Sequence, residues 1–205
     1  SLDAIQNRIY MDSVLLGEYP DPEAVAIPVD RSCVLHGDLA TIAQPLDVLG
    51  INYYNPTLVS APAEGNPLPF ELKQYPSDDT TDMGWPVVPD GLRHVLVQQK
   101  ERYSDALPPV MVTENGVAYP DVLEDGDAPR VDDPRRVQYL REHIAAVGRA
   151  IDEGVDVRGY FVWSFLDNFE WAEGYRPRFG LVYTDYPTQR RIPKASYSWF
   201  QSFLG

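Results

Sequence analysis

The sequence contains very little cysteine and histidine. Its 205 residues include one cysteine, Cys33, and three scattered histidines, His36, His94 and His143. A single cysteine excludes an intramolecular disulfide, so the fold does not depend on an oxidising compartment. Cysteine and histidine also show no spacing that is typical of a metal site, and we expect neither a metal nor a cofactor.

Long apolar runs and positive charge are scarce as well. The apolar runs are far shorter than the ~20 residues that a membrane-spanning helix needs, and no signal peptide opens the chain. The formal net charge of −14 disfavours nucleic acid and anionic membranes as partners and suits a neutral substrate. We therefore expect a cytoplasmic globular protein with neither nucleic-acid nor membrane partners.

Proline and aromatic residues are abundant instead. The chain has 19 Pro, 4 Trp, 13 Tyr and 7 Phe. Because the aromatics are interspersed with the prolines, the proline-rich stretches indicate ordered loops rather than disorder. Aromatic faces beside carboxylates are what a sugar-binding site needs, although most of these rings are expected to fill the core.

Apolar patterning predicts alternating strands and helices. Three short apolar segments predict buried strands at residues 46–53, 109–113 and 155–165. Helical spacing or capping residues predict helices at 2–9, at 90–103 with Asp90 as the cap, from Pro134 after Asp133 up to Gly154, and at 194–203. A hairpin strand is predicted at 179–183, and the proline-rich loop at 55–89 is expected to be functional.

This alternation predicts parallel βα units, either in a doubly wound sheet or in a barrel. No glycine-rich phosphate loop follows any of the three strands, which counts against a nucleotide-binding sheet. No cap or turn precedes Leu2, so the chain is expected to begin inside an element.

Polar residues occur where the predicted strands end. In an α/β barrel the active site lies at these carboxyl ends. Glu114 follows one strand directly, where a carboxylate has the rigid base that a nucleophile needs. The alternative for Glu114 is an ordinary junction between a strand and an Asn-Gly turn.

The third strand end combines polar and aromatic residues over residues 163–171. Asp167, Asn168 and Glu170 stand among large aromatic side chains, where unpaired polar groups would be costly to bury. A ligand rich in hydroxyl groups would pair with them. The alternative, which suits Asp167 and Asn168 best, is a structural hydrogen-bond network.

Several segments together resemble glycoside hydrolase family 1, the β-glucosidase and β-galactosidase family, and especially its bacterial members. In chain order they are QNRIYMDSVLLGEYP, DVLGINYYNP, TDMGWPVVPDGL, VTENG, GYFVWSFLDNFEWAEGYRPRFGLVYTDY and KASYSWF. The resemblance implies a (β/α)8 TIM barrel and hydrolysis of β-D-glucosides and related β-glycosides with retention. It further implies that residues 1–205 form part of one barrel domain, roughly strands six to eight, without the N-terminal half.

The resemblance also assigns roles to residues. Glu114 would be the nucleophile, Tyr54 would contact its carboxylate and keep it ionised, and Asn52 would face the glycone. The remaining assignments concern substrate binding, with no metal or cofactor. They are Glu170 as bidentate ligand of glycone hydroxyls with Trp171 beside it, Trp163 as the platform under the sugar ring, Phe179 closing the apolar side, and Trp85 near the aglycone.

The sequence departs from the family pattern at an essential point. The family's acid/base glutamate lies in a Thr-x-Asn-Glu-Pro motif on strand four, whereas the only Asn-Pro here, Asn55-Pro56, lacks the glutamate. The family's N-terminal Gln and its His-Trp pair are absent too. Smaller departures, at Ser13, Phe165 and Thr184, touch no proposed site residue.

Three hypotheses therefore remain open. The chain is a segment of a β-glucosidase that works with the rest of the barrel, a catalytically silent sugar-binding fragment, or a half-barrel that self-associates through its exposed sheet edges.

Overall fold

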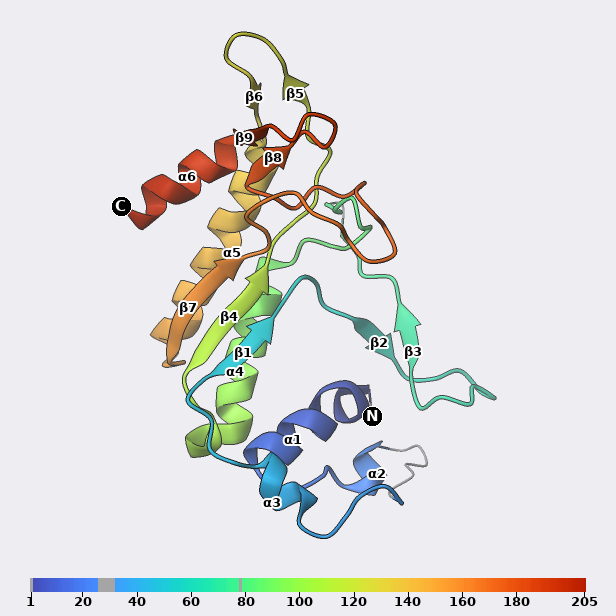
Figure 1. The fold of residues 1–205 in the computed structure, drawn as a ribbon. Coiled ribbons are helices and arrows are strands. Elements are labelled where there is room, and N and C mark those ends of the chain that lie inside the picture. Colours follow the sequence, from blue (N-terminus) through green and yellow to red (C-terminus); the bar gives the residue numbers. More distant parts are fainter. Residues whose placement is uncertain (1, 26–31, 78) are drawn as a thin grey trace. The chain divides into compact units, whose positions relative to one another are not determined.

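The computed structural model describes residues 2–25, 32–77 and 79–205 (Figure 1). The chain divides into two compact units. The first comprises Ser1–Leu49, Thr57–Tyr75 and Gln98–Pro109, and the second comprises Gly50–Pro56, Pro76–Val97 and Val110–Gly205. All eight residues that the sequence predicts as catalytic or substrate-binding belong to the second unit, whereas the proline-rich loop at 55–89 is divided between the two units.

The first unit is made of short helices and one hairpin. Its elements are a π-helical turn at Ala4–Arg8, α1 (Ile9–Leu15), α2 (Pro22–Val25), α3 (Asp38–Ile42), the strands β2 (Leu58–Ser60) and β3 (Glu71–Lys73), and a 3-10 turn at Ser104–Ala106. The helix expected at 2–9 is confirmed and continues to Leu15. Asp12 anchors it, because its carboxylate accepts hydrogen bonds from Arg8 at 2.9 Å and from the Tyr103 hydroxyl at 2.7 Å.

A three-stranded sheet forms the centre of the second unit. Its strands are β1 (Leu49–Asn52), β4 (Val110–Asn115) and β7 (Val157–Val162), in the order β1-β4-β7. β4 and β7 are parallel, and Figure 1 shows all three arrows pointing the same way. The three predicted strands are confirmed, but β4 extends to Asn115. Glu114 therefore lies within the strand, not directly after it.

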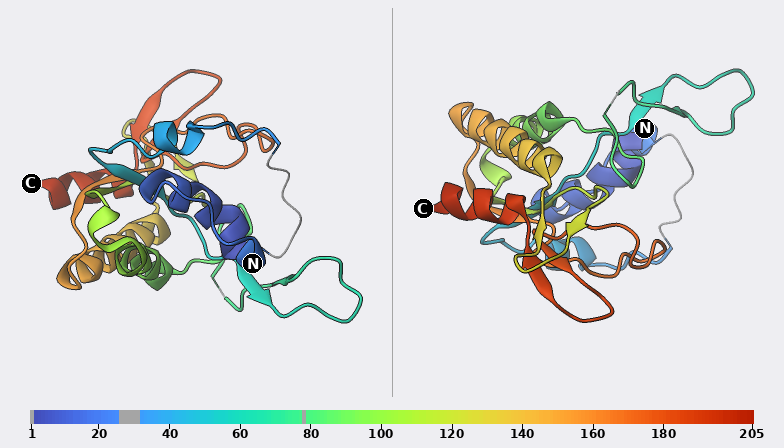
Figure 2. Two further views of the ribbon diagram at one scale, coloured as in Figure 1. Left: turned by 90° about the horizontal axis from the view of Figure 1, so that it is seen from below. Right: turned by 90° about the horizontal axis from the view of Figure 1, so that it is seen from above.

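Helices cover one face of this sheet. They are α4 (Pro89–Tyr103), α5 (Pro134–Asp152) and α6 (Ala195–Leu204), and both views of Figure 2 show α6 beside α5. Gly154, just past the end of α5, has φ of +86°, a conformation that glycine adopts without strain. The prediction that Asp90 caps α4 is wrong. The helix begins at Pro89, and the Asp90 carboxylate binds Arg93 at 2.9 Å instead.

Two antiparallel hairpins complete the second unit. β5 (Leu123–Glu124) pairs with β6 (Arg130–Val131), and β8 (Val182–Thr184) pairs with β9 (Arg191–Pro193). The hairpin strand predicted at 179–183 is thus confirmed with a small shift. Over the described residues the strands form one three-stranded sheet and three two-stranded sheets, and none closes into a barrel.

The core of the second unit fixes which face of the sheet is covered. Val117, Tyr139, Leu140 and Leu181 are buried together, and Val162 of β7 packs against them. Burying an aliphatic side chain of this kind stabilises the fold by about 1.5–3 kcal/mol. The opposite face of β7 carries Phe161, which is 55% exposed. The sheet therefore has a face that packs on helices and an open face. No described helix is long and apolar enough to cross a membrane.

Candidate active site

Glu114 and Tyr54 form a hydrogen-bonded pair on the open face. The Tyr54 hydroxyl donates to Glu114 Oε2 at 2.8 Å. Burial raises the pKa of Tyr54, and the adjacent Glu114 carboxylate raises it further. The phenol therefore stays protonated near neutral pH and serves as a fixed donor. The hydrogen bond from this donor holds one oxygen of the Glu114 carboxylate in place.

Asn52 lies on the same face as this pair. Its Oδ1 atom accepts a hydrogen bond from Thr113 Oγ1 at 2.7 Å, which joins the ends of β1 and β4. Both side chains are exposed. Asn52 is therefore placed where an amide can reach a ligand above the sheet.

Trp163 and Glu170 form a second pair. The indole Nε1 of Trp163, just after β7, donates to Glu170 Oε1 at 3.0 Å. Burial raises the pKa of Glu170, the bond from Trp163 lowers it, and the negative charge of Glu114 raises it. The two carboxylates therefore lie close enough for their charges to interact. The Trp163–Ser164 peptide is cis.

An aromatic wall borders the Glu114 carboxylate. The ring centroids of Tyr54 and Trp85 are 5.3 Å apart, and each lies 6.3 Å from that of Phe179. Phe179 is 2% exposed, so the wall is anchored in the core. The fold thus brings together Trp85 from the loop before α4, Tyr54 from the segment after β1, and Phe179 from the segment before β8.

Trp171 is the predicted site residue that the structure does not tie to the others. It follows Glu170 in the chain, but its side chain is 91% exposed. Its φ of +25° lies in the left-handed region, which a bulky residue rarely occupies. Its role beside Glu170 stays a prediction.

Asp167 and Asn168 take part in a structural hydrogen-bond network, as the alternative interpretation of these two residues expected. The Asp167 carboxylate accepts from Arg178 at 2.7 Å, Lys194 at 2.8 Å, and the Gly180 amide at 2.9 Å. Asn168 donates to Ser164 Oγ at 2.9 Å. The bonds from Arg178 and Gly180 to Asp167 hold together the two ends of residues 167–180, the segment that carries Glu170.

A chain of alternating buried charges extends from Asp167. Lys194 also binds Asp121, Asp121 binds Arg136, and Arg136 binds Asp133. Burial lowers the pKa of Lys194. Breaking one link of such a chain leaves a buried charge uncompensated, which costs about 3–5 kcal/mol. Only Asp167 could be expected in such a network from the sequence, because Asp121, Arg136 and Lys194 come from separate segments of the chain that meet only in the fold.

Gly116 is another residue whose importance the sequence did not reveal. A Cβ atom on Gly116 would lie 1.7 Å from the carbonyl oxygen of Trp163. Only glycine permits this approach, which brings the end of β4 against the end of β7. The alternative interpretation of Glu114, a junction with an Asn-Gly turn, is wrong, because Asn115 is the fully buried last residue of β4.

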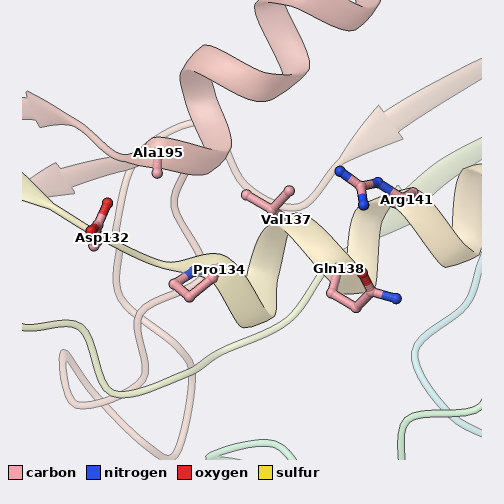
Figure 3. A pocket seen from close by; sticks show the side chains of 6 residues that line it. All are labelled: Asp132, Pro134, Val137, Gln138, Arg141 and Ala195. Carbon is pink, nitrogen blue, oxygen red and sulfur yellow. The ribbon is translucent and has the colours of Figure 1, made fainter.

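Two pockets of the second unit are lined by none of the predicted catalytic or substrate-binding residues. One of about 360 Å³ lies between the start of α5 and the start of α6, and Figure 3 shows its lining by Asp132, Pro134, Val137, Gln138, Arg141 and Ala195. The other, of about 530 Å³, is lined by Asp167, Tyr175, Thr184, Tyr186, Gln189 and Arg191. Neither includes Glu114, whose site is an open face of the sheet. Over the described ranges, no three His, Cys, Asp or Glu residues gather as a metal site would require.

Comparison with known proteins places the chain in a family. The profile of "Glycosyl hydrolase family 1" matches residues 1–205. The chain is 44% identical over 219 residues to a bifunctional β-D-glucosidase/β-D-fucosidase of Bifidobacterium breve, covering 99% of this chain and 47% of the relative. It is 42% identical to β-glucosidase A of Thermotoga maritima, covering 96% of this chain and 43% of the relative. The chain belongs to glycosyl hydrolase family 1.

Solved structures agree with this assignment. A psychrophilic β-glucosidase of Micrococcus antarcticus superposes with a TM-score of 0.89 at 40% identity, covering 99% of this chain and 47% of that one. The β-glucosidase of Thermotoga maritima in complex with glucoimidazole superposes with a TM-score of 0.84 at 38% identity, covering 96% of this chain and 43% of that one. The chain is thus similar to part of a (β/α)8 barrel and spans about half the length of these relatives.

Proposed function

We propose that this chain supplies the nucleophile and part of the glycone-binding site of a retaining β-glycosidase that acts on β-D-glucosides. The observation that carries the proposal is the Tyr54–Glu114 hydrogen bond of 2.8 Å beside the Trp163–Glu170 pair. A carboxylate held by a neutral donor, next to a second carboxylate and an aromatic wall, suits attack on a sugar. The relatives' names, which include β-glucosidase and β-D-fucosidase, support the substrate class.

The mechanism uses two carboxyl groups about 5 Å apart. Glu114 attacks the anomeric carbon and forms a covalent glycosyl-enzyme, while a second carboxylic acid protonates the departing glycosidic oxygen. That second group then takes a proton from water, the water attacks the same carbon, and Glu114 leaves. The product keeps the configuration of the substrate because two inversions have occurred. No metal or cofactor takes part.

Recognition of the sugar falls to the residues around Glu114. Ionised Glu170 accepts hydrogen bonds from glycone hydroxyls, while Trp163, held by its bond to Glu170, offers a ring face to the C–H side of the sugar. Asn52 binds a further hydroxyl at the opposite side of Glu114. Phe179 and Trp85 form the apolar boundary, and Trp171 lies beside Glu170.

The acid/base group has to come from outside these 205 residues. The sequence contains no Thr-x-Asn-Glu-Pro motif, and the chain covers 47% of the Bifidobacterium breve relative. The proposed partner is therefore the N-terminal half of a family 1 barrel. It would pair with β1 and β7, which are the edges of the described sheet.

The alternative is a catalytically silent fragment that binds sugar or self-associates. The exposed edges and the 55% exposed Phe161 favour association. A covalent probe separates the two functions, because 2,4-dinitrophenyl 2-deoxy-2-fluoro-β-D-glucoside has a leaving group that needs no protonation. It traps the glycosyl-enzyme and identifies the nucleophile by mass spectrometry.

The probe is applied to a fused protein, in which the N-terminal half of the Bifidobacterium breve relative precedes this chain. We expect one sugar to be attached at Glu114. Attachment at another residue would refute the assignment of the nucleophile, and a protein that binds glucose analogues without any attachment would favour the silent fragment.

A further inference from the structure

β4 does not pair regularly with β7 where it carries Glu114. Val112 is opposite Tyr160 and Asn115 is opposite Val162, so three steps along β4 match two steps along β7. Thr113 and Glu114 together therefore lie opposite a single residue. This arrangement is a β-bulge, which redirects side chains and often occurs next to active sites.

The bulge changes the face on which Glu114 lies. Successive side chains of a regular strand point to opposite faces, so Glu114 would share the face of Val110 and Val112. Those two valines are 0% exposed and lie in the core. The extra residue instead puts Asn115 on the core face, where it is also 0% exposed. Glu114 is thereby left on the open face, within reach of Tyr54.

Asn115 holds the bulge through its side chain. Its Nδ2 atom donates to the Tyr53 carbonyl oxygen at 2.7 Å and to the Tyr139 hydroxyl at 3.0 Å. Its Oδ1 atom accepts from the Tyr160 hydroxyl at 2.5 Å. One buried amide thus joins the end of β1, the strand β7 and the helix α5. In the regular register this position would face the open side, and all three bonds would be lost.

Two backbone features support the same arrangement. The Asn115 carbonyl oxygen accepts from the Trp163 amide at 2.9 Å, and the next residue, Gly116, closely approaches the Trp163 carbonyl. The Tyr53 amide donates to the Glu114 carbonyl oxygen at 2.9 Å. The backbone on both sides of the Glu114 side chain is therefore tied to the neighbouring strands.

We propose that Asn115 is a positioning residue that locks the β-bulge of β4 and so turns the Glu114 carboxylate onto the face where Tyr54 lies. This inference rests on the proposed role of Glu114 as nucleophile. A leucine or a serine at this position would fill part of the space but could not supply two donors and one acceptor together.

The test compares three variants in the fused protein. Asn115→Ala removes all three bonds, and Tyr160→Phe removes the bond to Oδ1. The matched control is Tyr53→Phe, because the Tyr53 hydroxyl donates a similar bond of 2.7 Å, to the Val88 carbonyl oxygen, away from the bulge. Thermal unfolding checks that Tyr160→Phe and Tyr53→Phe lower the midpoint temperature of unfolding by similar amounts.

The rate constant and the dissociation constant for trapping by the fluoroglucoside are then measured separately. We expect Tyr160→Phe to slow trapping about tenfold and Asn115→Ala about a hundredfold, since displacing a reacting group by ~1 Å can cost about 10²-fold. The dissociation constant should change less than about twofold, because the glycone contacts remain. Tyr53→Phe should change neither constant. Equal effects of Tyr160→Phe and Tyr53→Phe would overturn the proposal.

A crystal structure of the Asn115→Ala protein gives a readout that does not depend on activity. Loss of the bulge, with Glu114 opposite a β7 residue in regular register, is the expected result. If Asn115→Ala does not fold, the structure of Tyr160→Phe takes its place. An unchanged bulge together with an unchanged trapping rate overturns the role of Asn115. Trapping at a residue other than Glu114 overturns the proposed function instead. In that case the pairing register of β4 with β7 in the Asn115→Ala crystal structure still tests whether Asn115 locks the bulge.

Discussion

The indole nitrogen of Trp163 donates a hydrogen bond of 3.0 Å to the carboxylate of Glu170, seven residues further along the chain. The segment between them turns back on itself. Within this turn the Asp167 carboxylate accepts hydrogen bonds from Arg178, Lys194 and the Gly180 amide, which hold the turn in place. The proposed binding carboxylate and the proposed stacking ring are thus oriented as one unit.

Replacing Glu114 should abolish turnover. In the fused protein Glu114→Ala leaves no nucleophile, while the space it vacates can admit azide. We expect activity on an aryl β-glucoside to fall below detection, and azide to restore part of it with a glycosyl azide of inverted configuration. Nuclear magnetic resonance of the product checks the configuration. Glu173→Ala, which removes an exposed carboxylate paired with Arg176, is the matched control and should keep full activity.

Replacing Glu170 should weaken recognition of the sugar. A hydrogen bond to a charged group is worth about 1.5–3 kcal/mol, so Glu170→Ala should lower kcat/KM by at least about tenfold for each bond lost. Because burial raises the pKa of Glu170, its carboxylate should become protonated at a pH above the usual carboxyl range. Binding of the sugar should weaken at that pH. Rates of hydrolysis of an aryl β-glucoside over a pH series give kcat/KM and measure both effects. A kcat/KM close to that of the unaltered protein would make Glu170 structural only.

Tyr54→Phe should slow attack by Glu114. The hydrogen bond of 2.8 Å from the Tyr54 hydroxyl holds the Glu114 carboxylate, and a hydrogen bond to a charged group is worth about 1.5–3 kcal/mol. We expect the rate of trapping by the fluoroglucoside in the fused protein to fall about ten- to a hundredfold. Tyr10→Phe, at a position 67% exposed, serves as the control. An unchanged trapping rate would show that Tyr54 does not position Glu114.

His143 should make stability depend on pH. Its ring is buried and stacked on Tyr139, and burial lowers its pKa to about 4. The unfolded chain takes up the proton near pH 6.5, so the folded state loses stability as pH falls from about 6.5 to about 4, by up to about 3 kcal/mol. Denaturant unfolding at several pH values measures this slope. His143→Phe should make the stability less dependent on pH, whereas His94→Gln, at an exposed position, should leave the dependence unchanged. Equal slopes in these two variants and the unaltered protein would contradict the prediction.

The 205-residue chain alone should be self-associated or poorly folded and should show negligible glucosidase activity. The sheet has the edges β1 and β7, and Phe165 beyond β7 is 61% exposed. Without a proton donor for the leaving group, the rate also loses the about 10²–10⁴-fold that a general acid contributes. Sedimentation and hydrolysis of an aryl β-glucoside check both points. A monomer with ordinary turnover would contradict them, whereas adding the N-terminal half should restore some activity.

The order of the strands and helices could be predicted because their signals are local. The helix after Asp133 has apolar side chains at alternating steps of three and four, and it forms as α5. The bounds of strands and helices could not be predicted as well from the sequence, because capping depends on which hydrogen-bonding groups lie nearby in the folded chain. Asp90 illustrates this, because its carboxylate binds Arg93 and Arg149 and does not cap α4.

The family, the candidate site residues and the positions of Asn52, Glu114 and Trp163 near the ends of three strands could be predicted from the sequence, because motifs and apolar periodicity are properties of neighbouring residues. The open position of Glu114 and the burial of Asn115 could not, because they depend on tertiary contacts. By strict alternation Glu114 would have joined Val110 and Val112 in the core. The register of β4 depends on its pairing with β7 and on hydrogen bonds from Asn115 to residues 24, 45 and 62 positions away, which no local pattern contains.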